Sequence, residues 1–139
     1  MTIWLAGMRI TADRLNDHEA EDTTTTGLVA GTDFSVSSFS GKKVGGLTQI
    51  VVLCSRTGSA LTESSAGSGN LSPEPLMATL PSGWRPPETI PTLFSNGAAD
   101  GEAIINTAGE ITLRTISGSS GIGTSTTVRL THTWISENS

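Results

Sequence analysis

The chain of 139 residues has no tyrosine and few aromatic or charged side chains. Aromatic residues make up 4% and charged residues 15% of the sequence, whereas an ordinary globular domain has about 25% charged residues. Lys42 and Lys43 are its only lysines. Coiled coils and helical bundles are built mainly from Ala, Leu, Glu and Lys, so the composition excludes both architectures.

Cysteine and long apolar runs are also scarce. Cys54 is the only cysteine, which excludes an intrachain disulfide and a thiolate metal cluster and predicts a small buried side chain. No apolar run approaches the ~20 residues that cross a bilayer, so no membrane insertion is expected. The N-terminus lacks the basic start of a signal peptide. We therefore expect synthesis in a cytoplasm and delivery by assembly rather than secretion.

Sequence patterns of catalysis are missing as well. His18 and His132 are far apart in the sequence, and no His or Cys pair has the spacing of a metal site. Nucleophile-elbow, phosphate-loop and dinucleotide-binding spacings do not occur. The acidic balance, with a net charge of −5 and a pI near 4.8, argues against a nucleic-acid partner. The sequence predicts no enzyme, no catalytic residue, no metal and no cofactor.

Small uncharged residues are abundant in place of the missing types. The chain has 21 Thr, 18 Ser and 16 Gly. Threonine suits a pleated surface because its β-branch packs and its hydroxyl tolerates water. Short apolar stretches alternate with turn signals, which predicts about six to eight strands in an antiparallel β-sandwich or jelly-roll-like knob.

Several strands can be placed individually. Phe34 to Phe39 predicts a strand with an irregularity near Ser38, and residues 41–46 a turn that holds both lysines. The apolar run 47–54 predicts a central strand buried on both faces. Residues 102–107 and 110–117 predict a hairpin around a turn at 108–109.

The prolines are confined to residues 71–91. Because proline removes a ladder donor, this segment is predicted to be extended, irregular and unable to complete a sheet.

The sequence divides into an attachment arm and linker at 1–27 and a knob domain at 28–139. Residues 13–22 carry a net charge of −4. Thr11 is a candidate cap for a short helix over 12–20, and residues 23–27 are a linker or a first edge strand. We expect the arm to dock on another protein through its large apolar side chains: Ile3, Trp4, Leu5, Met8 and Leu15.

Two groups in the knob are candidates for contacts. Leu130, His132 and Trp134 share one face of the predicted last strand, as core residues or as a trimer interface with His132 near a threefold axis. Trp84 beside Arg85 is either a packing anchor or a sugar-stacking platform.

Two stretches carry a family resemblance. The sequence 80–87 (LPSGWRPP), followed by 101–105 (GEAII) and 108–113 (AGEITL), resembles the C-terminal head domains of bacteriophage receptor-binding and fibre proteins. The stretch 4–16 (WLAGMRITADRLN) is similar to the opening of tail and other surface proteins of phages that infect actinobacteria.

The resemblance implies a homotrimeric virion surface protein with a β-sandwich head. Heptads and Gly-X-Y repeats, which would build a fibre shaft, are missing. Two virion roles therefore stay open: a tail-associated protein, either minor tail or receptor-binding, and a capsid decoration protein. A third alternative is a carbohydrate-binding module for a host-surface glycan, centred on Trp84 and Arg85.

Overall fold

The structure is a computed structural model that describes residues 21–117 and 120–136. Within these residues the chain forms eleven strands and no helix, so the predicted all-β class is confirmed. No described segment is a helix of the length and apolarity needed to cross a membrane. The helix predicted over 12–20 lies outside the described residues. The strands are β1 (Asp22–Thr24), β2 (Val29–Ala30), β3 (Phe34–Val44), β4 (Leu47–Arg56), β5 (Leu61–Thr62), β6 (Leu76–Thr79), β7 (Ile90–Ser95), β8 (Asp100–Ile105), β9 (Glu110–Leu113), β10 (Gly121–Ile122) and β11 (Thr127–Ile135).

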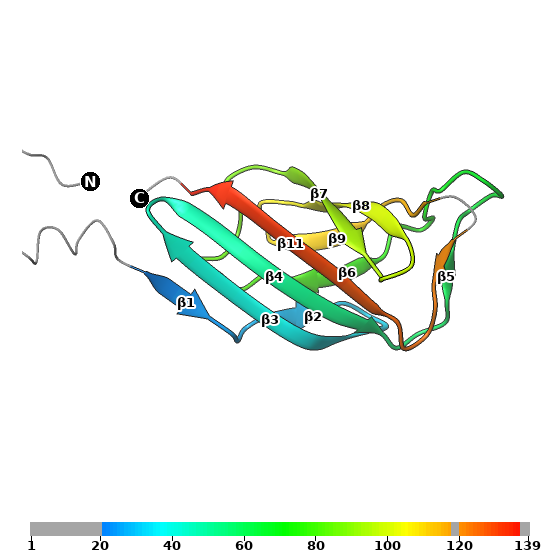
Figure 1. Cartoon of the computed structure of the whole chain (residues 1–139), viewed down its shortest axis with the longest axis horizontal. Coiled ribbons are helices and arrows are strands. Elements are labelled where there is room, and N and C mark those ends of the chain that lie inside the picture. The colour runs from blue at the N-terminus through cyan, green and yellow to red at the C-terminus, as the bar shows by residue number, and fades with distance from the viewer. Residues whose placement is uncertain (1–20, 118–119, 137–139) are drawn as a thin grey trace, which may run out of the picture.

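Nine strands join into one curled antiparallel sheet. Their order is β1-β3-β4-β11-β7-β8-β9-β6-β2, and β5 and β10 form a separate two-stranded sheet. The large sheet curls until β2 and β6 approach β3. Figure 1 shows the long strands β3, β4 and β11 in one layer, with β6, β8 and β9 behind them. The predicted sandwich-like knob is therefore confirmed, and it is made from a single half-closed sheet.

The hydrophobic core lies between the two layers. Buried and exposed side chains alternate along β11 and β9, as they do in strands with one face on a core. A sequence that is only 35% apolar can thus fill a core, because only one face of each of these strands lies against the core. The core includes Ile50, Val52, Cys54, Met77, Ile105, Ile111, Leu113, Val128 and Leu130.

Strand β3 confirms the predicted irregularity and corrects the predicted turn. Its register against β4 shifts just before Ser38, as a β-bulge does. The strand continues through Lys42 and Lys43, so the lysines do not lie in the turn. Only Gly45 and Gly46 reverse the chain, with φ of 55° and 80°. A two-residue hairpin turn of type I′ requires such left-handed backbone at both positions, and glycine adopts it without strain.

Strand β4 is buried on one face rather than on both. Its inward row runs from Thr48 to Arg56 and is buried throughout. On the outward row, Val51 and Leu53 are half-buried and Leu47 is 45% exposed. The prediction of two buried faces was wrong because, among residues 21–117 and 120–136, no second layer covers the outer side of this sheet.

The proline-rich segment is less irregular than predicted. Strand β6 pairs with both β9 and β2, and Pro91 lies inside β7 opposite Ile104. β6 completes the sheet because its four residues contain no proline. The irregular backbone is confined to the stretches on either side of β6. The predicted hairpin is present as β8 and β9, and the predicted last strand is β11.

The described chain enters and leaves the knob at one end. Asp22 of β1 lies opposite Lys43, beside the Gly45–Gly46 turn. Ser136, the last described residue, donates from its backbone N–H to the Gly46 carbonyl at 2.8 Å. We call this the terminal end. Strand β4 runs from it for ten residues, about 30 Å at ~3.3 Å per residue, to Arg56 at the far end (Figure 1).

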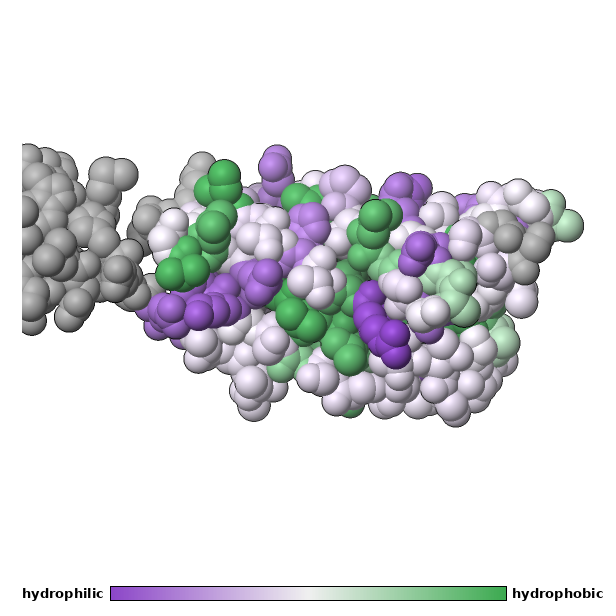
Figure 2. Space-filling model, in the orientation of Figure 1, coloured by the Kyte–Doolittle hydropathy of each residue, from purple (hydrophilic) through white to green (hydrophobic). Residues whose placement is uncertain are grey.

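Hydroxyl side chains cross-link the outer face of β3, β4 and β11. The Ser55 hydroxyl lies 2.7 Å from that of Ser37 and 3.2 Å from that of Thr127. Figure 2 shows apolar and polar side chains side by side on this face. Ser and Thr therefore supply hydrogen bonds between strands where the sheet meets water, and Thr adds the strand propensity of a β-branched residue.

Candidate functional site

Trp84 anchors the segment after β6 to strand β3. Its side chain is only 7% exposed. An added Cβ on Gly41 would come within 2.5 Å of the indole ring, so the ring lies directly on this glycine. The Lys43 ammonium lies 4.6 Å from the ring centroid and donates to the Gly83 carbonyl. A ring covered in this way offers no open face to a sugar, and the structure favours the packing interpretation of Trp84.

Arg85 holds the same segment to the opposite layer. Its Nε donates to the Leu80 carbonyl at 3.1 Å, and its Cγ lies so close to Gly109 that an added Cβ there would be 2.8 Å away. The Leu80 N–H also donates to the Gly109 carbonyl. Trp84 and Arg85 are thus adjacent in sequence but tie the segment to different parts of the sheet.

The three candidate interface residues on β11 belong to the inward face. Leu130 is 2% exposed and Trp134 is 8% exposed, and both are part of the hydrophobic core. They are therefore not available to a neighbouring subunit in this structure, because the chain's own second layer covers them.

His132 is half-buried beside them. Its ring stacks on Trp134 with centroids 6.4 Å apart, and Nδ1 lies 3.0 Å from the Thr92 hydroxyl. Burial lowers the pKa of His132 below its usual value. The ring is hydrogen-bonded inside the chain, as the core interpretation of this histidine predicts.

The predicted attachment residues lie outside the described part of the chain. This applies to the whole set, Ile3, Trp4, Leu5, Met8 and Leu15. Their role stays a prediction. Strand β1 is an edge strand of the sheet, which is one of the two alternatives expected for residues 23–27.

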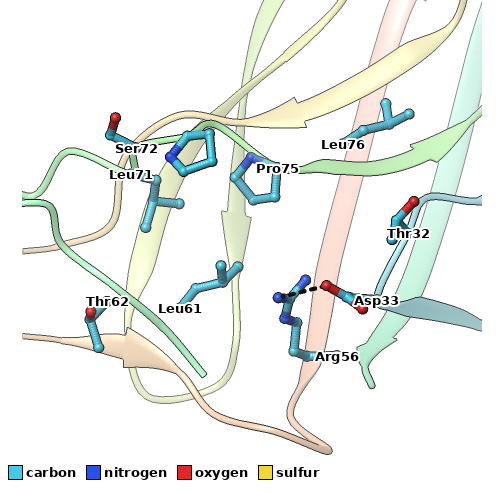
Figure 3. Close-up of a pocket in the computed structure, with 10 residues that line it drawn as sticks. Thr32, Asp33, Arg56, Leu61, Thr62, Leu71, Ser72, Pro75 and Leu76 are labelled. Carbon is cyan, nitrogen blue, oxygen red and sulfur yellow. Dashed lines mark hydrogen bonds and ion pairs between the residues drawn. The ribbon is translucent and has the colours of Figure 1, made fainter. Parts of the chain in front are cut away.

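A pocket of about 380 Å³ opens at the far end of the knob. Figure 3 shows Arg56 and Asp33 facing one another on one side of it, with Leu61 and Leu71 across from them. Segments far apart in the sequence meet here, since β4, β5 and the loops before β3 and β6 all contribute. The lining residues are Thr32, Asp33, Arg56, Leu61, Thr62, Leu71, Ser72, Pro73, Pro75 and Leu76.

Arg56 is a charged side chain on the core face of β4. The guanidinium Nε donates to the Ser59 carbonyl at 2.9 Å, and Nη2 lies 3.4 Å from Asp33 Oδ2. The guanidinium carbon lies 4.9 Å from the centroid of the Phe34 ring. Only 6% of the side chain is exposed. A buried arginine is costly unless it is paired, so these contacts fix the cation at the pocket wall.

Asp33 is positioned by its own backbone. Its φ is 66°, a left-handed conformation that Asp and Asn adopt more readily than most residues. The Asp33 carbonyl accepts from the N–H groups of Thr57 and Gly58 at 2.8 and 3.2 Å. An added Cβ on Gly58 would come within 2.5 Å of the Asp33 side chain. The carboxylate is therefore held beside Arg56 while 53% of its side chain stays exposed.

The sequence contained one signal for this site. Continuing the period of two along β4 from Ile50 places Arg56 on the buried face, and a charge on a core face is an informative exception. Nothing in the sequence paired Arg56 with Asp33, which lies 23 positions earlier. Their contact depends on the pairing of β3 with β4, in which Phe34 lies opposite Arg56.

The pocket chemistry is that of hydrogen bonding. A guanidinium and a carboxylate side by side supply donors and an acceptor against an aliphatic wall. Within the described ranges, no three His, Cys, Asp or Glu side chains are grouped so that they could hold a metal ion. Burial raises the pKa of the Cys54 thiol to about 11, so this residue lies in the core as an uncharged thiol.

Comparison with known proteins gives a fold and no sequence family. No protein-family model matches the chain, and no curated protein matches its sequence. A solved structure matches the chain in its fold. The crystal structure of the receptor binding protein (gp15) of Listeria phage PSA superimposes with a TM-score of 0.50 at 13% sequence identity, covering 89% of this chain and 70% of that one. At this identity the similarity is one of fold.

Proposed function

We propose that the chain is a bacteriophage virion protein of the tail, displayed on the particle surface, that binds the host cell. The observation that carries this proposal is the fold similarity over 89% of the chain to a phage receptor binding protein. The motif resemblance at 80–87 supports it independently. In this proposal the chain acts by binding and not as an enzyme, and it joins the particle during assembly in the host cytoplasm.

The geometry of the knob supports a division of labour between its two ends. The predicted arm, residues 1–27, joins the sheet at the terminal end, where β1 pairs with β3. The Arg56 pocket opens at the opposite end of β4. A protein docked on other virion proteins through its arm would direct the far end outward, towards a host-surface glycan or another receptor.

We expect the protein to act as a homotrimer, as the resemblance implies. Because Leu130 and Trp134 are covered by the chain's own core, the subunit contacts must use other residues. Light scattering of the purified protein should give about three times the chain mass of 14.3 kDa. A monomer at micromolar concentration would exclude the trimer while leaving the receptor-binding role open.

The location on the particle tests the main proposal. Gold-labelled antibodies against the knob, viewed on intact particles by electron microscopy, should mark the tail. Label spread over the head would instead establish capsid decoration and overturn the tail assignment.

Deletion of residues 1–20 tests the arm. The shortened chain should fold but should not join particles that lack the full-length protein. Incorporation of the shortened chain at the normal level would contradict the attachment role.

A further inference from the structure

Arg56 retains hydrogen-bonding capacity that faces the pocket. A guanidinium has five N–H donors, and its contacts with the described residues use Nε and one donor on Nη2. The Nη2 to Oδ2 distance of 3.4 Å is long for a charge-assisted hydrogen bond, which is about 2.7–2.9 Å. The protein therefore holds this cation in place without saturating it, and a ligand in the pocket can accept from it.

Asp33 places an acceptor next to these donors. Its carboxylate is half-exposed, while the left-handed backbone and the Thr57 and Gly58 N–H groups keep the residue fixed. A hydroxyl group both donates and accepts. Two neighbouring hydroxyls on one ligand would therefore match the pair, one accepting from Arg56 and one donating to Asp33.

The remaining walls are mainly aliphatic, with the hydroxyl side chains of Thr32, Thr62 and Ser72 between the apolar ones. Leu61, Leu71, Pro73, Pro75 and Leu76 line the pocket, and none of its lining residues is aromatic. Such walls suit the C–H face of a saturated ring, whereas a planar base or aromatic ligand would find no ring to stack on.

We propose that this pocket is a binding site for a compact, uncharged, polyhydroxylated ligand, namely a single sugar ring with neighbouring hydroxyl groups. The biological meaning of the site rests on the proposed receptor-binding function. The volume of about 380 Å³ lies at the small end of the roughly 300–1,000 Å³ typical of small-molecule sites. The site differs from the Trp84 and Arg85 pair, whose side chains hold the 80–87 segment in place.

Charge favours an uncharged ligand over an ion. Arg56 and Asp33 carry opposite charges within 3.4 Å of one another, so the pair is neutral as a whole. An anion attracted to Arg56 would meet the carboxylate, and a cation attracted to Asp33 would meet the guanidinium. A neutral hydroxylated ligand has no such conflict and uses both groups.

Nuclear magnetic resonance of the full-length, isotope-labelled protein tests the site directly. We would titrate free glucose, galactose, N-acetylglucosamine and rhamnose to high millimolar concentration, with inorganic phosphate as the anionic probe. At least one sugar should shift the backbone signals of Asp33, Arg56 and Leu61 while leaving the terminal end unchanged. Shifts caused by none of the sugars, or by phosphate more strongly than by every sugar, would overturn the proposal.

Asp33→Asn is the informative variant. Asparagine tolerates the same left-handed backbone and keeps the side-chain size, but it replaces a charged acceptor with a neutral amide. The affinity for the responding sugar should fall about tenfold or more. The thermal midpoint should fall as well, because the buried Arg56 loses its charged partner, so the affinity is measured at a temperature at which the variant is folded. Asp22→Asn makes the same chemical change at the terminal end, and it should leave the affinity as in the wild type.

A second variant covers the case in which Asp33→Asn weakens the fold. Thr32→Trp places a large side chain at the exposed rim of the pocket and should block sugar binding without touching Arg56. If both variants keep wild-type affinity, the sugar binds elsewhere and the proposed site is wrong.

Binding of the fluorescently labelled protein to a panel of intact bacteria separates this proposal from the proposed function. Cell binding that survives both Asp33→Asn and Thr32→Trp would retain the receptor-binding role and reject the pocket. Sugar binding at the pocket without binding to any cell would retain the pocket and count against the receptor-binding role.

Discussion

Gly41 shows how the absence of a side chain can fix the position of a distant segment. It lies inside β3, where glycine ordinarily weakens a strand, and the Trp84 ring occupies the space that a Cβ would take. The proline-rich segment can then lie flat on the sheet, with Lys43 over the ring.

The first prediction concerns this contact. Gly41→Val should destabilise the protein by about 1–3 kcal/mol, because overpacking forces side chains and backbone to shift. Urea denaturation followed by tryptophan fluorescence measures the loss. Ser40→Val, at the exposed neighbouring position, is the matched control and should change stability little. Equal stability of the two variants would show that the Trp84 ring does not rest on Gly41.

The second prediction concerns His132. Burial favours the neutral ring and lowers its pKa in the folded state below 6.5, the value it has in the unfolded chain. The unfolded chain then binds a proton at a higher pH than the folded one. Above about pH 6.5 the ring is neutral in both states and costs the fold nothing. As the pH falls from 6.5 to the lower pKa of the folded state, protonation of the unfolded chain reduces the free energy of unfolding.

Urea denaturation of the wild type and of His132→Gln between pH 7.5 and pH 5 tests this. The variant should lose less stability over that range. The same substitution at His18, the other histidine in the sequence, measures the general effect of removing an imidazole. A steeper decline in His132→Gln than in the wild type would contradict the assigned direction.

At the scale of an element, the β8–β9 hairpin depends on one turn side chain. Asn106 Oδ1 accepts from the N–H groups of Ala108 and Glu110, each at 3.0 Å, and Nδ2 donates to the Glu110 carboxylate at 2.7 Å. The side chain thus makes three hydrogen bonds in this turn, in which Gly109 adopts a left-handed backbone conformation.

The third prediction follows from these bonds. Asn106→Ala should destabilise the protein by about 1–2 kcal/mol, since it removes the acceptor of two backbone donors in the turn. Thermal unfolding by circular dichroism measures the effect. Thr107→Ala, at an exposed position of the same turn, serves as the control and should be nearly neutral. A loss as large in Thr107→Ala would mean that the Asn106 side chain is not the specific support.

At the scale of the whole molecule, Cys54 reports whether the two layers separate. It is fully buried in the core, and burial raises the pKa of its thiol to about 11. Because the thiolate is the reactive form, the native protein keeps the thiol both inaccessible and protonated.

The fourth prediction is that Ellman's reagent at pH 8 reacts with Cys54 only on global unfolding. The free energy of opening, obtained from the rate of thiol modification at increasing urea concentration, should equal the free energy of unfolding from equilibrium denaturation. A variant with Cys54→Val and Ser55→Cys moves the thiol to the half-buried outer row of β4 and should react rapidly. Fast reaction of the wild type without denaturant would indicate local opening of the sheet.

Local patterns in the sequence predicted most of the strands. The alternation from Val128 to Trp134 placed β11, and the β8–β9 hairpin and the bulge before Ser38 were also found. Two of the errors share one cause. The run 47–54 looked buried on both faces, and residues 41–46 looked like a turn. Neither local pattern shows which distant segment packs on a strand, such as Trp84 on Gly41.

The candidate site was harder to predict than the fold. Trp84 and Arg85 stood out in the sequence as either a packing anchor or a sugar-stacking platform, and the structure uses both for packing. Asp33 and Arg56 were not singled out, because their side chains meet only after β3 has paired with β4.

The sequence by itself determined the class of the protein: small β-branched and hydroxyl side chains, alternation along short segments and glycine turns specify antiparallel strands through local geometry. Only the tertiary structure decided which faces are buried and which end carries the pocket. Those properties depend on how a nine-stranded sheet curls over itself, and that curling brings together side chains that no local pattern connects.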